Sequence, residues 1–305
     1  MSQSVTSFGA AFRKLRQQRG YKLKEAAGDI VSPQFLSRFE RDLAGISVDK
    51  FSRLLVRIGA SWNDFLRCYN GDCLTHLIST LENFKEFYDS KDFYQFAQVA
   101  KQSVEESYRD HPLMKQLITG VINVHLAILN QEVSKCKREL DALKLYLSSI
   151  DTWGDLEWFI YSFMVDECPM AMIQFRTEQA IGFLRTSRLT TLTPKGIMTI
   201  IFHGIRVLCL HRFLDVAEEM VCLLKKELKR SKYKTYVVEH LALKCYVALI
   251  LVLKNRPEGL KLAKKCITIF EVLENDLDIS HLTLSKNLFF AFIEKHRDKS
   301  IPFDW

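Results

Sequence analysis

The chain has few of the residues and patterns that would indicate strands. Only 6 of its 305 residues are proline, and most of these stand between helical runs. After residue 72 no segment shows a sustained alternation of apolar and polar residues bounded by turn residues. We therefore expect an all-α fold.

Long apolar runs and catalytic motifs are also missing. The longest apolar run, residues 246–253, is far shorter than the roughly 20 residues that cross a bilayer, and the polar N-terminus does not resemble a secretory signal. No GxSxG, HExxH, Walker or GxGxxG pattern is present, and the 8 histidines are scattered. We expect a cytoplasmic protein that is not an enzyme, does not enter a membrane and needs no cofactor.

Eight cysteines are present, but a chain of this length with 48% apolar residues can build a core without disulfides. We interpret them as reduced thiols. Cys68, Cys73 and His76 have a spacing that could bind zinc, although a fourth ligand is missing. We favour ordinary buried thiols and no metal.

The net charge of +7 is concentrated near the N-terminus. Residues 1–70 contain 12 Lys or Arg against 6 Asp or Glu, whereas residues 71–305 contain 31 against 30. A small basic domain can neutralise DNA phosphates, and a nearly neutral body needs a different role. We place the domain boundary at the turn-forming residues that follow position 69, which gives domains 1–70 and 71–305.

Residues 22–40 have the pattern of a helix, a tight turn and a second helix. One apolar face is predicted for the first helix, and Ser32 and Pro33 suit the cap and first position of the second. In this second helix the inward residues are predicted to be Phe35, Leu36 and Phe39, and the outward ones Gln34, Ser37, Arg38 and Arg41. Outward amides, hydroxyls and guanidinium groups suit the reading of a DNA groove.

Three more helices complete this first domain. We expect one before residue 20, ended by Gly20, one capped by Ser47, and one capped by Ser61. Trp62, Phe65 and Leu66 are predicted to close the core. The outward basic residues can contact phosphate or be an ordinary solvated surface, and we leave both open for Arg13, Lys14, Arg53 and Arg57.

The remaining chain reads as a series of helices. We predict them at residues 73–89, 91–108, 112–130, 133–150, 154–168, 170–186, 194–211, 213–230, 232–254, 257–275 and 280–296. Consecutive pairs recur about every 36 to 44 residues, near the period of tetratricopeptide-like and HEAT-like repeats. Such pairs stack into a superhelix with a concave surface.

A few polar residues stand within otherwise apolar helices of this body: Asn123, His203, Arg206 and Asn287. They can line a groove that binds a peptide, or be satisfied polar groups between packed helices, and we leave both open. Arg206 is the first to test, because a charge among apolar neighbours needs a partner or a wet cavity. The aromatic cluster around Trp153 and Trp158 can be core packing or a binding surface, and we favour core.

Residues 7–69 resemble the helix-turn-helix of phage-repressor (XRE/Cro/cI) type. The segment FLSRFERDLAGIS followed by a long helical body resembles the Rgg/MutR/GadR regulators of Gram-positive bacteria. The resemblance implies a five-helix repressor-like head followed by a tetratricopeptide-like repeat domain that binds a short imported signalling peptide. It also implies an ion pair between Arg16 and Glu40.

The resemblance further implies how promoter DNA would be bound. Gln34, Ser37 and Arg38 would meet bases, Lys22 and Arg41 would meet phosphates, and Ser32 belongs to the same surface. Two positions depart from the family pattern. Ile30 replaces a common turn glycine, with Gly28 two residues earlier, and Pro33 replaces a polar base reader.

These observations support two hypotheses of different class. The first is a homodimeric, sequence-specific transcriptional regulator that is switched by a peptide, with two heads on two half-sites. The alternative is a helical-repeat scaffold, or a ligand-independent regulator, whose body binds another protein.

Overall fold

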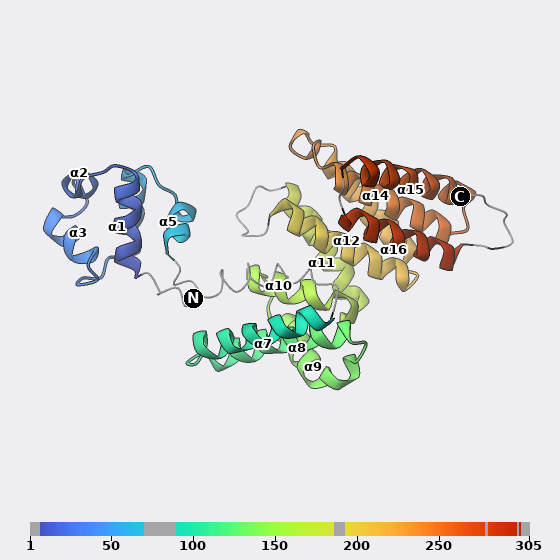
Figure 1. Ribbon diagram of the computed structural model, residues 1–305, viewed down its shortest axis with the longest axis horizontal. Helices are drawn as coiled ribbons and strands as arrows, with labels where there is room; N and C mark the ends of the chain where they lie inside the picture. The colour runs from blue at the N-terminus through green and yellow to red at the C-terminus, as the bar shows by residue number, and fades with distance from the viewer. Residues whose placement is uncertain (1–6, 70–89, 186–192, 278–279, 298, 300–305) are drawn as a thin grey trace. The chain divides into compact units, whose positions relative to one another are not determined.

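The computed structural model describes residues 7–69, 90–185, 193–277, 280–297 and 299 (Figure 1). Within these ranges every regular element is a helix, and no strand occurs. The all-α prediction is therefore confirmed. Two compact units form, residues 1–111 and 112–305, while the boundary expected after residue 70 stays a prediction. The helix expected at 73–89 lies outside the described residues.

Five helices form the head, the name used below for residues 7–69. They are α1 (Phe8–Gln18), α2 (Leu23–Ala27), α3 (Pro33–Phe39), α4 (Val48–Arg57) and α5 (Trp62–Cys68). Serine hydroxyls cap four of these helices by accepting a backbone N–H from the first turn: Ser7, Ser32, Ser47 and Ser61. The three predicted caps are confirmed.

Aromatic rings build most of the core of the head. Phe12, Phe51 and Phe65 are completely or almost completely buried, and Phe8 packs edge-on against Phe65 with ring centroids 4.7 Å apart. Because the five helices are short, a few large rings must fill the space between them. Phe39 of α3 joins this core, with its ring centroid 6.0 Å from that of Phe51.

Trp62 and Leu66 correct the prediction for α5. Phe65 is buried as expected, but Trp62 is 41% exposed and Leu66 37% exposed. The inward stripe instead continues from Phe65 to Tyr69, whose rings stack at 5.5 Å. A seven-residue helix presents one narrow face to the core, so Trp62 covers only its edge: the ring packs against Phe51 with centroids 5.1 Å apart, and much of its surface stays in solvent.

The second unit begins at α8 and consists of successive helical hairpins, here called the repeat body (residues 112–297). Its helices are α8 (Pro112–Leu129), α9 (Lys137–Ser149), α10 (Asp155–Met164), α11 (Met170–Arg185), α12 (Pro194–Leu210), α13 (Leu214–Leu228), α14 (Val237–Leu253), α15 (Pro257–Leu277) and α16 (Ser280–His296). The helix α7 (Ser90–Ser107) falls in the first unit. Short 3-10 turns at Val133–Cys136 and Ser231–Tyr233 precede α9 and α14, so these two helices begin later than predicted.

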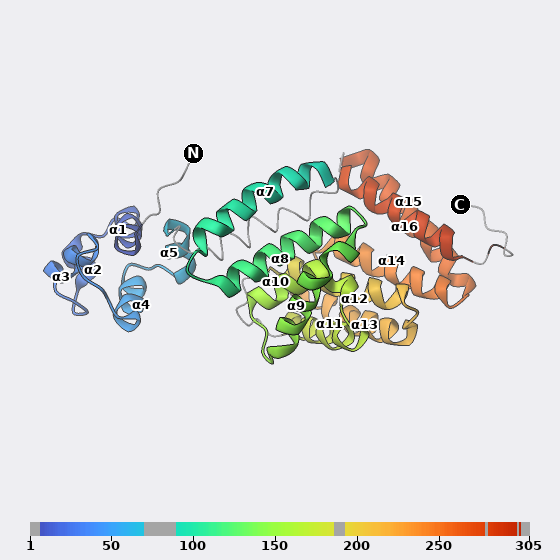
Figure 2. The same ribbon diagram turned by 90° about the horizontal axis from the view of Figure 1, so that it is seen from below.

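The hairpins of the repeat body pack in two layers (Figures 1 and 2). In one layer α8 packs on α10, α12 on α14, and α14 on α16, while in the other α11 packs on α13. Side-chain bonds between hairpins join residues about one repeat apart: Arg206 with Asp166, 40 residues, Arg185 with Glu227, 42 residues, and Lys254 with Asp215, 39 residues. These separations agree with the repeat period read from the sequence.

A glycine allows a close contact between α11 and α12 in the repeat body. A Cβ atom on Gly204 of α12 would lie 2.0 Å from the hydroxyl oxygen of Thr177 on α11. Any side chain at position 204 would therefore push the two helices apart.

One helix among the described residues, α8, is long and apolar enough to cross a membrane by composition. Its mean hydropathy is 1.3, and 39% of the 18-residue window is buried. The helix contains no long uninterrupted apolar run, because Asn123 and His125 interrupt its apolar residues. A core helix passes the same test, and α8 packs against α9 and α10.

Candidate nucleic-acid interface

Helix α3 presents a polar face to solvent. Leu36 and Phe39 anchor it in the core, whereas Gln34 and Arg38 are exposed and Ser37 is half-buried. At its start the Ser32 hydroxyl accepts the N–H of Phe35 at 3.1 Å, and Pro33 occupies the first turn. The helix is therefore held by its apolar side and leaves amide, hydroxyl and guanidinium groups outside.

The residues predicted to contact DNA gather on this helix and at its ends, except for Lys22. Arg38 donates to the carbonyl of Leu43 at 3.4 Å, and Arg41 donates to the carbonyl of Ser37 at 3.1 Å. Each guanidinium has five N–H donors, so one such bond leaves others for a partner. Lys22 is exposed at the N-terminus of α2, where its backbone N–H is bonded to Glu25.

A buried ion pair joins α1 to the end of α3. The guanidinium of Arg16 donates to both carboxylate oxygens of Glu40, at 2.6 and 2.8 Å. It also donates to the carbonyl of Tyr21 at 2.7 Å. The prediction of a structural pair is confirmed, and the pair fixes the C-terminal end of α3 against α1.

Asp42 provides a second link that the sequence reasoning missed. Its carboxylate accepts the N–H of Gly9 at 3.1 Å and the hydroxyl of Ser7. Asp42 has a φ of 59°, a conformation that Asp adopts more readily than most residues. The position after α3 thereby holds the start of α1, and only the tertiary structure shows the 33-residue contact.

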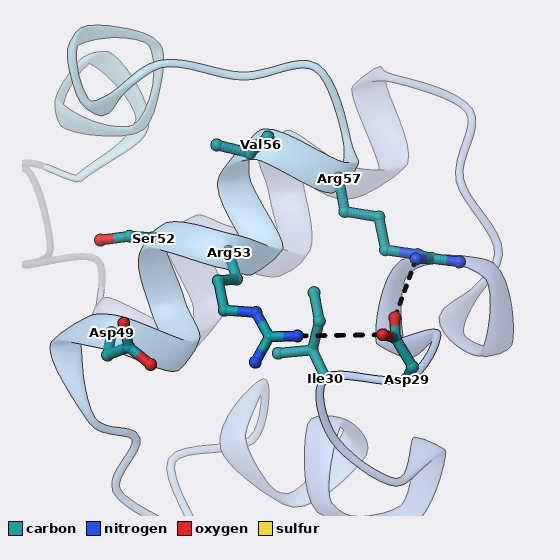
Figure 3. A pocket seen from close by; sticks show the side chains of 7 residues that line it. All are labelled: Asp29, Ile30, Asp49, Ser52, Arg53, Val56 and Arg57. Atoms are coloured by element: carbon teal, nitrogen blue, oxygen red, sulfur yellow. Dashed lines mark hydrogen bonds and ion pairs between the residues drawn. The ribbon is translucent and has the colours of Figure 1, made fainter.

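The turn between α2 and α3 rests on α4 (Figure 3). Gly28 has a φ of 48° and ends α2, so the turn has its glycine two residues before Ile30. Arg57 donates to the carbonyl of Glu25 at 2.7 Å and to the carboxylate of Asp29 at 3.2 Å. Arg53 approaches the same carboxylate to 3.8 Å. Phosphate contact by Arg53 or Arg57 thus has to compete with Asp29.

The structure does not bring all four candidate peptide-binding residues together. His203 and Arg206 lie one turn apart on α12 and are half-buried, Asn123 is half-buried on α8, and Asn287 is exposed on α16. All three helices belong to the same layer of the repeat body. The positions of Asn123 and Asn287 agree with either of the two interpretations left open.

Arg206 has a partner, Asp166, which the sequence did not reveal. One nitrogen of its guanidinium lies 2.7 and 2.6 Å from the two carboxylate oxygens, and both side chains remain partly exposed. The stacked rings of Phe202 and Tyr246 stand 5.4 Å apart on α12 and α14. Burial raises the pKa of Tyr246, and the positive charge of Arg206 acts in the opposite direction. The charged Arg206 and the rings of Phe202 and Tyr246 therefore lie on the same layer, the one that contains α12 and α14.

The aromatic cluster around Trp153 and Trp158 is core, as favoured. Trp153, Trp158 and Tyr161 are at most 6% exposed. The guanidinium of Arg176 lies 3.6 Å from the centroid of the Trp153 ring and donates to Gln179 at 2.8 Å. The cluster packs α10 against α11.

No group of three metal-ligating side chains occurs among the residues that the structure describes. Cys73 and His76 of the possible zinc cluster lie outside them. Cys68 stands near Gln18, with its sulfur 3.7 Å from the amide oxygen.

Comparison with known proteins identifies a family for most of the chain after the head. The model of the C-terminal domain of the helix-turn-helix transcriptional regulator Rgg matches residues 97–281. Among solved structures, the Streptococcus dysgalactiae SHP pheromone receptor Rgg2 is 17% identical with a TM-score of 0.66. That match covers 95% of this chain and 98% of the receptor.

Two further structures are similar in fold. PlcR of Bacillus thuringiensis, in complex with the peptide PapR7 and DNA, is 15% identical over 93% of this chain and 99% of PlcR, with a TM-score of 0.60. The complex of PrgX with cCF10 is 15% identical over 98% of this chain and 95% of PrgX, also at 0.60. At these identities the structures show a shared fold of helix-turn-helix head and helical-repeat body.

The matched family model defines a transcriptional regulator rather than an enzyme. Because the family model matches more than half of the chain, the chain belongs to the Rgg family of transcriptional regulators.

Proposed function

We propose that this protein is a homodimeric regulator that binds specific promoter DNA and is switched by a short signalling peptide in the concave groove of its repeat body. The observation that carries the DNA-binding part is the polar face of α3, held in place by a buried core and by the Arg16–Glu40 pair. The structure of PlcR with a peptide and DNA supports the proposal through the shared fold. Such a role places the protein in the cytoplasm.

On DNA, α3 would enter the major groove with Gln34 and Arg38 toward the bases. Gln suits adenine and Arg suits guanine, each bidentate pair giving roughly 1 to 3 kcal/mol of discrimination. Ser32 and Ser37 lie on the same surface, and Lys22 and Arg41 would hold phosphates. A dimer would set two heads on half-sites about one helical turn apart.

Two substitutions test the DNA-binding part. A duplex selected by the full-length protein from a randomised library would be compared with a scrambled duplex across a range of salt concentrations. Gln34→Ala should reduce the preference for the selected duplex. Lys22→Ala should weaken binding to both duplexes and lower the salt slope by about 0.9 for the lost phosphate contact. If neither variant changes binding, α3 is not the reading helix.

The peptide part rests on the layer that carries His203 and Arg206. A peptide carboxylate would meet Arg206, and Asp166 would have to share the guanidinium or release it. Thermal-shift screening of synthetic peptides against the wild type and Arg206→Ala tests this. We expect at least one peptide to raise the melting temperature of the wild type but not that of Arg206→Ala. If no peptide raises the melting temperature of the wild type, the proposal is contradicted.

The Arg206–Asp166 pair also favours the second candidate, a regulator or scaffold whose body needs no peptide. In this case the arginine already has its partner within the chain. Arg206→Ala would then lower the stability of the repeat body without changing the response to any peptide. Retention of a specific partner protein by the repeat body in the absence of peptide would support this second function.

A further inference from the structure

We infer that Arg57 is a positioning residue that sets the angle of α3 by bracing the turn before it. The inference rests on the proposed DNA binding, because it assigns to α4 a part in reading the sequence. The sequence leaves two interpretations open for Arg57, a phosphate contact and an ordinary solvated surface residue. The contacts of its guanidinium support neither interpretation.

The first contact is with the end of α2. The Nε of Arg57 donates to the carbonyl of Glu25 at 2.7 Å. The last carbonyls of a helix lack partners within the helix and must bond elsewhere. Arg57 therefore satisfies one of them from a residue 32 positions later in the chain, and ties α2 to α4.

The second contact is with the turn itself. A terminal nitrogen of Arg57 donates to Asp29 at 3.2 Å. A Cβ on Gly28 would lie 2.2 Å from the central carbon of the guanidinium. Gly28 thus serves two purposes: its φ of 48° turns the chain, and its missing side chain leaves room for Arg57.

The surroundings argue against a phosphate at this position. Asp29 is highly exposed, and it lies between the guanidinium groups of Arg53 and Arg57 (Figure 3). Asp49, Ile30 and Val56 line the same pocket. An incoming phosphate would meet the carboxylates of Asp29 and Asp49, and would have to draw Arg57 away from two acceptors.

Helix α3 is consequently held at both ends by arginines from other helices. Arg16 of α1 holds Glu40 after its last turn, and Arg57 of α4 holds the turn before its first. Base recognition needs hydrogen-bond geometry within a few tenths of an ångström. Loss of the Arg57 contacts with the turn should therefore weaken base recognition more than it weakens binding to the DNA backbone.

Arg57→Lys tests this in the full-length protein because it keeps the charge but cannot reproduce the forked contact with Glu25 and Asp29. Arg53→Lys is the matched control, since Arg53 lies one turn earlier on α4 and reaches Asp29 only at 3.8 Å. The probes are a duplex selected from a randomised library by the wild type and a scrambled duplex. We expect Arg57→Lys to lower the ratio of the two affinities by about fivefold or more, the scale of one lost base contact. Arg53→Lys should leave this ratio unchanged.

Hydrogen exchange provides a measurement that does not depend on DNA. In Arg57→Lys, amides of residues 28–35 should exchange faster while those of α1 keep their protection. Unchanged exchange of these amides overturns the assignment of Arg57. The assignment is also overturned if the wild type selects a sequence and Arg57→Lys leaves the affinity ratio unchanged. A salt slope that falls by about 0.9 in Arg57→Ala also overturns it, because that marks a phosphate contact. If the wild type selects no sequence, the proposed DNA binding fails, and the exchange measurement still decides whether Arg57 braces the turn.

Discussion

The head and the repeat body each bury an arginine, and they stabilise it in different ways. Arg16 in the head and Arg176 in the repeat body are both 7% exposed. Arg16 makes a forked bond with the carboxylate of Glu40, whereas Arg176 lies against the ring of Trp153. The carboxylate fixes both distance and direction, while the ring face provides a broader area of contact.

The two regions also differ in which elements their polar contacts join. In the head, the Arg16–Glu40 pair joins the end of α3 to α1, and Arg57 of α4 bonds to α2 and to the turn before α3. In the repeat body, polar contacts join one hairpin to the next at intervals of about one repeat, as for Arg185 with Glu227 and Lys254 with Asp215. The polar contacts of the head therefore converge on one helix, whereas those of the repeat body connect successive hairpins along its length. Four predictions test this contrast.

The largest effect is expected from Glu40→Ala in the head. It leaves Arg16 buried without its partner, which typically costs about 3 to 5 kcal/mol. Hydrogen exchange of the full-length protein should show lost protection in α1 and α3 and little change in α12 or α14. Arg19→Ala, which removes a more exposed pair with Asp64, is the control and should cost at most about 1 kcal/mol. Equal effects of the two variants would mean that Glu40 does not fix α3.

In the repeat body, Gly204→Ala should destabilise by about 1 to 3 kcal/mol, because its Cβ would overlap Thr177. Denaturant unfolding followed by tryptophan fluorescence measures the change, since Trp153 and Trp158 lie in this region. Gly182→Ala is the matched control: it is also helical, and a Cβ there meets no atom within 4 Å. It should be neutral or stabilising by up to about 1 kcal/mol. Addition of Thr177→Ala should relieve part of the loss caused by Gly204→Ala.

Arg176→Met keeps the apolar volume of the side chain but removes the cation from Trp153. We expect a loss of about 1 to 2 kcal/mol and a change in the tryptophan emission spectrum. Lys232→Met removes a more distant cation, 4.9 Å from the ring of Tyr233, and should have a smaller effect. If Arg176→Met costs as much as Glu40→Ala, then the repeat body depends on its buried arginine as much as the head does.

The smallest effect is expected from Asp64→Asn in α5, and it should depend on pH. The backbone N–H of Ser61, followed by the Ser61 hydroxyl, lowers the pKa of Asp64 below its ordinary value of 3.8. A lowered pKa in the folded state stabilises the protein above about pH 4, and this stabilisation is lost as the pH falls through the lowered pKa. Melting temperatures of wild type and variant should therefore differ slightly at about pH 7 and converge near about pH 3. A constant difference would show that the charge of Asp64 does not contribute.

Local features of the head could be predicted because they depend on nearby residues. The caps at Ser32, Ser47 and Ser61, the start of α3 at Pro33 and the outward position of Gln34 all follow from spacing and backbone chemistry. The period of the repeat body was equally visible, since the helix pairs predicted from the sequence recur about every 36 to 44 residues. The resemblance added the Arg16–Glu40 pair, which joins residues 24 positions apart.

The sequence by itself therefore determined the helices, their caps, the basic head and the repeat period, because these depend on contacts within a few residues. Only the tertiary structure decided that Asp42 holds α1, that Arg57 holds the turn before α3, and that Asp166 pairs with Arg206. Each of these contacts spans 28 or more residues. The exposed flank of Trp62 and Leu66 was decided in the same way, because the burial of a side chain depends on which neighbouring helix packs against it. Charge and spacing identify residues that need partners, and the packing of the helices selects which partners they find.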